Sequence, residues 1–213
     1  MLGFRDRHVV VTGGAGALGG AVLAALSAEG AICHAPERAE LELLDEDAVA
    51  RWYAARPALW ASIHLAGGFA MAPLEATSVA DLRFQHDLNV VTCFLACREA
   101  ARAIRRSAAG AGRIVNVASR AALVPSGGML AYSASKAAVG MITQALAHEL
   151  APGILVNAVA PSIIDTPANR RAQPAADHAS WPTSAEVAEA ILWLASPRNT
   201  LTSGVVLPIY GKA

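Results

Sequence analysis

Short apolar runs alternate with helical stretches along the whole chain, and this order constrains the fold more than any other feature. The first run, His8–Val11, is rich in β-branched residues and leads directly into a glycine-rich turn. An alanine- and leucine-rich stretch follows, from about Leu18 to Glu29. Strands that alternate with helices form a parallel sheet covered on both faces. We therefore expect an α/β fold, with residues 1–213 forming one domain around a doubly wound parallel sheet.

The remaining elements follow from the same patterns. Asp45 is a good N-cap for a helix, and Pro152-Gly153 ends another. Residues 162–183 are rich in proline, alanine and asparagine, and we expect them to form a short, mobile substrate loop. Further strands are expected at 31–34, 40–43, 60–65, 113–118, 154–159 and 205–209, and further helices at 46–55, 79–106 in two pieces, 132–150 and 186–195.

The composition excludes several classes of protein. Hydrophobic residues make up 54% of the 213 residues and charged residues 16%, so a large core can be buried. The 17 basic residues balance the 17 acidic ones, so no overall field favours nucleic acid or an anionic membrane. The N-terminal region lacks the features of a signal peptide, and no apolar run reaches membrane-spanning length. These features predict a cytoplasmic protein with no nucleic-acid or membrane partner.

The three cysteines do not indicate a secreted disulfide scaffold. Cys33, Cys93 and Cys97 cannot all pair with one another. Cys93 and Cys97 can share one face of a helix, but no second Cys or His pair with ligand spacing accompanies them. We therefore expect no metal site.

The turn after the first strand is suited to a dinucleotide. A diphosphate needs backbone N–H donors at a helix N-terminus with no side chain in the way. Glycines alone are weak evidence, but strand, glycine turn, helix and second strand in this order indicate a Rossmann dinucleotide site. The candidate cofactor contacts in this turn are Gly13, Gly14, Ala15, Ala17, Leu18 and Gly19.

Tyr132 and Lys136 lie four residues apart, on one face if the segment is helical. A cation beside the phenol lowers the tyrosine pKa from about 10, which makes the side chain a general acid or base. The alternative is an ordinary surface pair on a helix, since Tyr and Lys occur at this spacing on many helices. The pair alone does not decide between these interpretations.

The turn also resembles the TGxxxGxG signature of the short-chain dehydrogenase/reductase family, except that Ala17 replaces the middle glycine. Ser119 precedes Tyr132 by 13 residues, which is the family's own gap, and Asn89 matches the family's catalytic asparagine. The resemblance implies that Tyr132 exchanges a proton with a carbonyl or alcohol substrate while hydride moves to or from nicotinamide. Ser119 would bind the same oxygen. Lys136 would lower the tyrosine pKa and hold the nicotinamide ribose, and Asn89 would sustain a proton relay through water.

Three further segments match the family. His64-Leu65-Ala66-Gly67 stands where the family has Asn-Asn-Ala-Gly, so His64 is either a ligand contact or a core histidine. Asn157–Ser162 resembles the NxxxPG segment, with Ser162 in place of glycine. Glu42 and Leu43 stand where the family has an Asp-Val pair beside the adenine, or are simply a strand residue and a core residue. The other cofactor contacts that the resemblance implies are Ala66, Gly67, Gly68, Pro161, Ser162, Ile164 and Thr166.

The cofactor type depends on the end of the second strand. Glu37 lies 18 residues after Gly19, close to the position at which an acid binds both ribose hydroxyls and repels a 2′-phosphate. Arg38 follows and can instead pair with a 2′-phosphate, or both residues are solvated loop charges. We expect NAD(H) to be favoured, with NADP(H) as the alternative.

The resemblance covers nearly the whole chain, but the chain is a compact variant of the family. The stretch between the second and third expected strands is too short for the usual intervening helix. This layout and the GGAGALG turn also resemble dihydropteridine reductase, a family relative that lacks the serine at position 119. A small-molecule carbonyl or alcohol substrate and a homotetramer or homodimer are implied. The alternative is a dinucleotide-binding sensor without turnover, although it would have no chemical need for all four catalytic residues.

Overall fold

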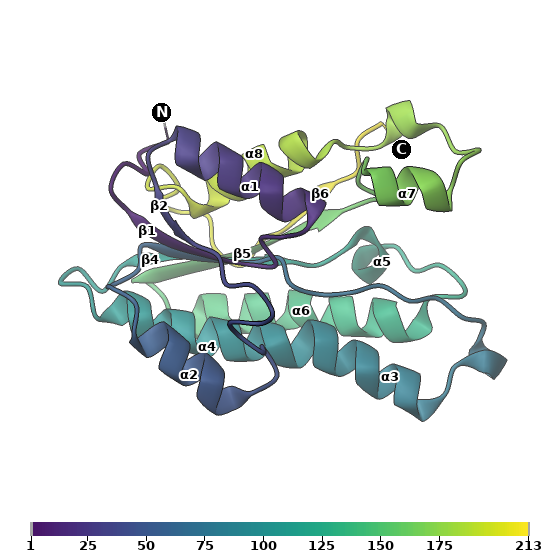
Figure 1. Cartoon of the computed structure of the whole chain (residues 1–213), viewed down its shortest axis with the longest axis horizontal. Coiled ribbons are helices and arrows are strands. Elements are labelled where there is room, and N and C mark those ends of the chain that lie inside the picture. The colour runs from purple at the N-terminus through teal and green to yellow at the C-terminus, as the bar shows by residue number, and fades with distance from the viewer. Residues whose placement is uncertain (1, 213) are drawn as a thin grey trace.

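The computed structural model describes residues 2–212 and shows a six-stranded sheet between two layers of helices (Figure 1). All neighbouring strands are parallel, in the order β2-β1-β3-β4-β5-β6. The expected doubly wound α/β fold is therefore confirmed. The strands are β1 (His8–Thr12), β2 (Ile32–His34), β3 (Ala61–His64), β4 (Gly112–Val117), β5 (Ile154–Pro161) and β6 (Val206–Ile209).

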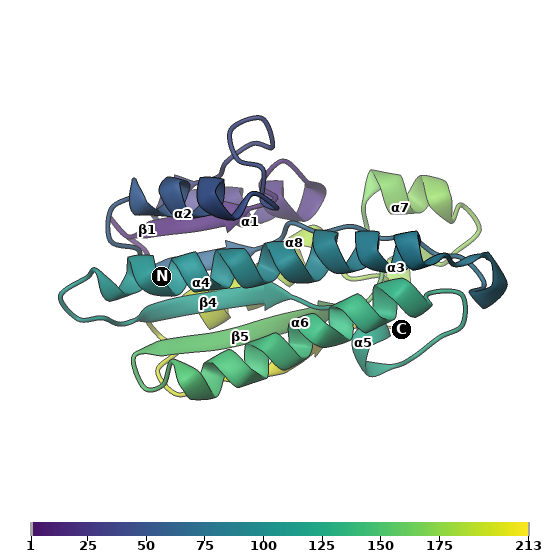
Figure 2. The same cartoon turned by 90° about the horizontal axis from the view of Figure 1, so that it is seen from below.

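Helices cover both faces of the sheet, as Figures 1 and 2 show. Helices α1 (Ala17–Ala28) and α8 (Ser184–Ala195) lie on one face, and α2 (Glu46–Ala54), α4 (Thr92–Arg105) and α6 (Leu130–Glu149) lie on the other. Side chains alternate between the faces of a strand, so each strand contributes to two cores. In β1, Val9 and Val11 pack in the core under α1 and α8, whereas Val10 packs in the core under α2, α4 and α6.

Side chains at the helix ends explain where several helices begin. Asp45 accepts a hydrogen bond from the backbone N–H of Ala48 at 2.9 Å, which confirms it as the N-cap of α2. Thr183 and Glu186 form a capping box at the start of α8. None of the helices within residues 2–212 has a stretch long and apolar enough to cross a bilayer.

The strand expected at 40–43 is wrong. These residues form turns between β2 and α2, and only Leu41 among them is buried. A parallel strand added beside β2 needs a crossover connection of about a dozen residues or more. Only residues 35–39 separate β2 from this segment, so the chain crosses directly to α2 and then to β3 on the far side of β1.

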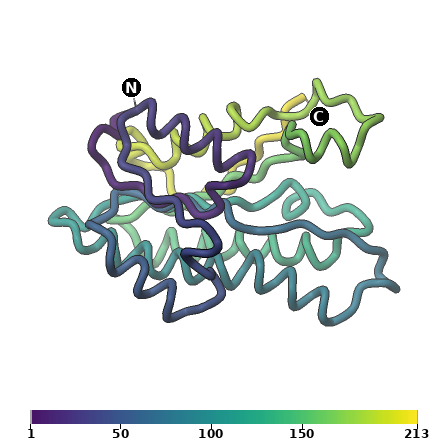
Figure 3. The backbone as a smooth tube through the Cα atoms, in the orientation of Figure 1, coloured from purple at the N-terminus to yellow at the C-terminus, as the bar shows by residue number. Residues whose placement is uncertain are grey.

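The long helical stretch at 79–106 is in two pieces, as expected. Helix α3 (Val79–His86) and α4 are joined by a π-helical turn, Asp87–Val91. The segment 162–183 contains a short helix, α7 (Pro167–Ala172), and a 3-10 turn, His178–Ser180. Figure 3 shows that this segment and the connection after β3 leave the same end of the sheet.

Candidate active site

Ser119 and Tyr132 lie near the carboxyl end of β4. Ser119 follows the strand directly and begins the short helix α5 (Arg120–Leu123), where its hydroxyl accepts a hydrogen bond from the Ala121 N–H at 3.2 Å. Tyr132 lies in the first turn of α6. The Ser119 side chain is close enough to that of Tyr132 to lower the pKa of the phenol. Ligands of doubly wound sheets bind at this edge, so the pair lies where the fold favours a substrate.

Lys136 lies one helical turn after Tyr132 and is only 7% exposed. Its ammonium donates a hydrogen bond to the Val117 carbonyl at 2.9 Å. Burial lowers the pKa of Lys136 from 10.5 to about 8, because the charged form loses hydration. The side chain is therefore poised to change its charge near neutral pH.

The pKa of Tyr132 is raised in the structure, so the expectation that Lys136 lowers it is wrong. Burial is the larger cause, and the hydrogen bond to Ser119 offsets part of it. The Lys136 ammonium is directed to Val117, and its own charge is disfavoured by burial.

The buried lysine predicts an unusual dependence of stability on pH. Lys136 binds a proton up to about pH 8 in the folded protein and up to 10.5 when unfolded. Between these values the unfolded chain holds more protons, so the free energy of unfolding rises with pH. Below pH 8 the buried charge of Lys136 lowers the free energy of unfolding by its full amount, at most about 3 kcal/mol. Urea denaturation across this window should show the rise in the wild type and lose it in Lys136→Met. An equal rise in both proteins would contradict the assignment.

Asn89 lies in the π-helical turn, and its buried side chain connects two parts of the site. Its amide oxygen accepts from the Gly68 N–H and its amide nitrogen donates to the Gly68 carbonyl, both at 3.0 Å. The same nitrogen donates to Ser135 in α6 at 3.1 Å. π-Helical turns are rare and frequently occur at functional sites. Here the turn lets Asn89 hold the segment after β3 against α6.

Glycine at positions 67 and 68 permits this close approach. A Cβ on Gly67 would lie 2.6 Å from the Asn89 amide oxygen and 3.3 Å from the Lys136 ammonium, and a Cβ on Gly68 would overlap Leu88. The structure therefore brings Ala66–Gly68 against two of the predicted catalytic residues. Ala66 also contacts the first turn, because a Cβ on Gly13 would lie 2.6 Å from its nitrogen.

The glycine-rich turn packs tightly and leaves the N-terminus of α1 open. Gly13 has a φ of +74°, and a Cβ on Gly19 would overlap the Gly13 carbonyl oxygen, so larger side chains at these positions would open the turn. No side chain caps the N-terminus of α1, and Ala15, Gly16 and Ala17 are exposed. The N–H groups of the first turn are thus available to an anion. Gly14 is buried and Leu18 is half-buried beside them.

The residues predicted to bind the adenosine end are mostly exposed. Glu37 and Arg38 follow β2 in a loop, and Arg38 forms an exposed ion pair with Glu42 at 3.4 Å. Leu43 is half-buried and packs against the core. The structure therefore places Glu42 beside Arg38 rather than in a strand.

The residues predicted at the nicotinamide end follow β5. Pro161 is buried as the last residue of β5, and the Ser162 hydroxyl donates to the Tyr210 carbonyl at 3.0 Å. Ile164 packs against the core, and Thr166 caps α7 by accepting from the Asn169 N–H at 3.2 Å. These residues lie at the same sheet edge as Ser119.

The sequence patterns did not indicate two residues that belong to this region. Ser135 donates to the Tyr132 carbonyl at 2.7 Å and accepts from Asn89, so it joins two predicted catalytic residues. Phe69 packs edge-on against the Tyr132 ring, with centroids 4.9 Å apart, although it is 58% exposed. The only signal for Ser135 was its place between Tyr132 and Lys136, and no local pattern indicates Phe69.

His64 is a buried histidine with both ring nitrogens hydrogen-bonded. Nε2 pairs with Ser62 at 2.8 Å and Nδ1 with Asn116 at 2.8 Å. Both ring nitrogens therefore have partners inside the fold, as expected for a core histidine.

Comparison with known proteins gives the same family that the sequence motifs indicate. The family model described as short chain dehydrogenase matches residues 39–177. The chain is 33% identical to cis-4-hydroxycyclohexanecarboxylate dehydrogenase of Sinomonas cyclohexanicum, over 98% of this chain and 96% of the relative. It is 31% identical to cyclopentanol dehydrogenase of Comamonas testosteroni, over 97% and 96%.

Among solved structures, the ligand-free aldohexose dehydrogenase of Thermoplasma acidophilum is 25% identical, with a TM-score of 0.87 over 98% of this chain and 94% of that one. Both the sequence relatives and this structure extend over almost the whole chain. The chain belongs to the short-chain dehydrogenase family and is an NAD(P)-dependent oxidoreductase.

Proposed function

We propose that the protein transfers hydride between a nicotinamide dinucleotide and a small alcohol or carbonyl compound, with Tyr132 as the general acid or base. The observation that carries this proposal is the placement of Ser119 and Tyr132 near each other at the carboxyl end of β4, with Lys136 buried one helical turn after Tyr132. Two neighbouring hydroxyls can bind a single substrate oxygen and exchange a proton with it.

Each residue has a separate part in this proposal. Ser119 donates a hydrogen bond to the substrate oxygen and fixes its position, while Tyr132 gives or takes the proton at that oxygen. Lys136 holds a positive charge close to the site, and Asn89 fixes the segment Ala66–Gly68 beside it. The nicotinamide, when bound, supplies or accepts the hydride.

The residues present fit such a dinucleotide. The open N-terminus of α1 and its glycine turn suit the diphosphate. Pro161, Ser162 and Thr166 lie at the same edge of the sheet as Ser119, where we place the nicotinamide end. We place the adenosine ribose near Glu37, after the end of β2.

We expect NADH to bind more tightly than NADPH. The charge of Arg38, the residue suited to a 2′-phosphate, is partly neutralised by Glu42 at 3.4 Å, and Glu37 beside it repels an anion. Both Arg38 and Glu42 are exposed, so the pair itself is weak and the preference should be modest, about tenfold or less. Dissociation constants for both cofactors, measured by fluorescence titration, check this.

Glu42→Ala is the matched test of that explanation. It frees Arg38 and should tighten NADPH binding a few-fold while NADH binding stays unchanged. Tighter binding of NADPH than NADH by the wild type would contradict the assignment of NAD(H).

Small alicyclic secondary alcohols are the substrates to try first. This choice is supported by the cyclic alcohols in the names of the two relatives described above. Turnover of cyclopentanol, cyclohexanol and 4-hydroxycyclohexanecarboxylate with NAD⁺ or NADP⁺, followed by formation of reduced cofactor, tests the proposal. We expect at least one of these alcohols to be oxidised. A failure across ketones, quinones and pteridines as well, with normal dinucleotide binding, would instead favour a sensor without turnover.

We also propose that the protein is a homo-oligomer, a tetramer or a dimer. Large apolar side chains on α3 and α4 support this, because Val79, Leu82, Phe84 and Phe94 are all at least 43% exposed. A mass of one chain by light scattering would contradict it.

A further inference from the structure

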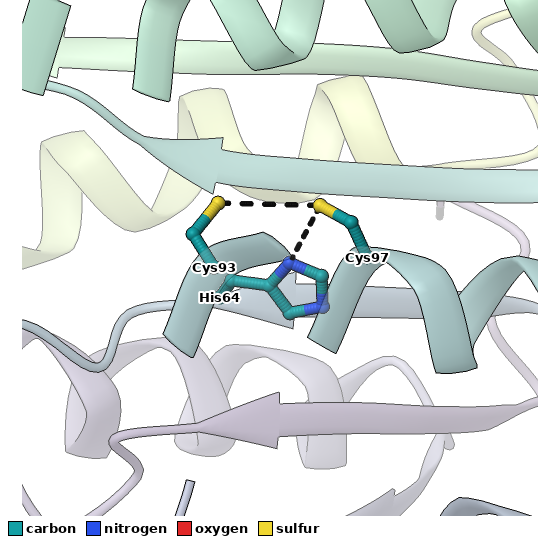
Figure 4. Close-up of side chains that lie close together, drawn as sticks. All are labelled: His64, Cys93 and Cys97. Carbon is teal, nitrogen blue, oxygen red and sulfur yellow. Dashed lines mark hydrogen bonds between the residues drawn. The ribbon is translucent and has the colours of Figure 1, made fainter. Parts of the chain in front are cut away.

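One buried cluster of chemically reactive side chains has no part in the proposed reaction. His64 ends β3, and Cys93 and Cys97 lie on one face of α4, four residues apart (Figure 4). Their ligand atoms all lie within 4.8 Å of one another, and the three side chains are at most 6% exposed. Two thiols and an imidazole are the donors that zinc prefers in proteins.

We propose that His64, Cys93 and Cys97 bind a zinc ion, with the amide oxygen of Asn116 as the fourth ligand. The Asn116 oxygen lies 2.8 Å from His64 Nδ1 and 3.4 Å from the Cys97 sulfur, so it adjoins the same point. Binding of Zn²⁺ releases one proton from each thiol, and the four donors complete a tetrahedral set.

Two of the separations between donor atoms approach those of a zinc site. Zinc bonds sulfur at about 2.3 Å and nitrogen at about 2.0 Å, so in a tetrahedral site two sulfurs lie about 3.8 Å apart and a sulfur and nitrogen about 3.6 Å apart. The two cysteine sulfurs are 4.0 Å apart, and the Cys97 sulfur is 3.5 Å from Nδ1. The Cys93 sulfur lies within 4.8 Å of the histidine ligand atom, so zinc binding requires this side chain to move inward.

Charge balance favours a divalent ion in this position. Two thiolates and a neutral imidazole together carry two negative charges, which Zn²⁺ cancels. A monovalent soft ion such as Cu⁺ would leave one uncompensated charge among buried residues, and an unpaired buried charge is costly. The buried surroundings therefore favour zinc over copper.

The hydrogen bonds of His64 permit the change that binding requires. Nδ1 must give up its proton to bind zinc, and the proton then resides on Nε2, which faces the Ser62 hydroxyl at 2.8 Å. That oxygen has two lone pairs and can accept from His64 and from Tyr53, which lies 3.0 Å away. Ser62 thereby orients the imidazole, as partners of metal-bound histidines generally do.

Zinc content measured on intact protein tests the proposal. Reduced wild type, expressed in zinc-supplemented medium and purified without a metal-affinity step, is expected to retain about one zinc per chain. Cys97→Ser and His64→Asn should lose at least about nine-tenths of it, since each removes a strong ligand. Cys33→Ser is the matched control, because Cys33 is a half-buried thiol on β2 and should leave the content unchanged.

A second measurement, with cobalt, uses only the wild-type protein and so does not depend on whether a variant folds. Titration of reduced, zinc-depleted wild type with Co²⁺ should give thiolate-to-cobalt charge-transfer absorption and the visible bands of tetrahedral Co²⁺. A wild-type zinc content equal to that of Cys97→Ser, or equal loss in Cys33→Ser, would overturn the proposal. So would a cobalt spectrum without thiolate bands, or stoichiometric retention of copper in place of zinc.

Discussion

Replacing Tyr132 with phenylalanine is expected to reduce turnover by roughly 10²–10⁴-fold, the range that a general acid or base contributes. The change removes one oxygen and keeps the ring, so the edge-on contact with Phe69 at 4.9 Å remains. It also leaves the Tyr132 carbonyl to accept from Ser135. Dinucleotide affinity should therefore stay within about twofold of wild type, while kcat falls.

A control separates loss of the proton donor from a general effect of losing a phenol. Tyr210→Phe removes a hydroxyl from a half-buried tyrosine after β6, and we expect turnover near that of wild type. The measurement is the initial rate with whichever alcohol the wild type oxidises, together with the cofactor dissociation constant. Retained turnover in Tyr132→Phe would refute the role of Tyr132, and a weakened cofactor affinity would point to a structural effect instead.

The fold could be predicted from the sequence because its signals are local. Alternating apolar runs and helical stretches fix the parallel sheet, and the caps at Asp45 and near Pro152 mark helix ends correctly. The strand expected at 40–43 failed for a reason that is not local. A parallel strand requires a long crossover, and the five residues before this segment cannot form one.

The candidate site could be predicted only as far as motifs extend. The family pattern indicated Ser119, Tyr132, Lys136 and Asn89, and the structure brings these positions together. The family pattern did not indicate that burial raises the pKa of Tyr132, because burial is a property of the packed fold.

The His64 cluster shows the same limit. Cys93 and Cys97 were recognised as neighbours on a helix, but His64 lies 29 residues earlier on β3. The three side chains come together only because α4 packs against the sheet, and no spacing in the sequence predicts that contact. The expectation of no metal site was drawn without this third side chain.

The second large effect is expected at the glycine turn. Gly19→Ala should destabilise the fold by about 1–3 kcal/mol, the usual cost of forcing a methyl group into a packed position. The added Cβ would overlap the Gly13 carbonyl oxygen and lie 2.6 Å from the Gly14 carbonyl oxygen. Both are backbone atoms of the turn, so they can move away only if the turn opens. Dinucleotide affinity should fall by about tenfold or more, because the N–H groups of the turn lose their alignment.

Gly20 provides a matched control one residue along the same helix. A Cβ there meets nothing within 4 Å, so Gly20→Ala should stabilise α1 by about 0.5–1 kcal/mol and leave dinucleotide affinity unchanged. Urea denaturation gives the free energy of unfolding, and fluorescence titration gives the dissociation constant, for both variants. If Gly19→Ala and Gly20→Ala change dinucleotide affinity equally, the close packing of the turn does not contribute to diphosphate binding. If they diverge as expected, the effect belongs to the turn rather than to a change in helix propensity.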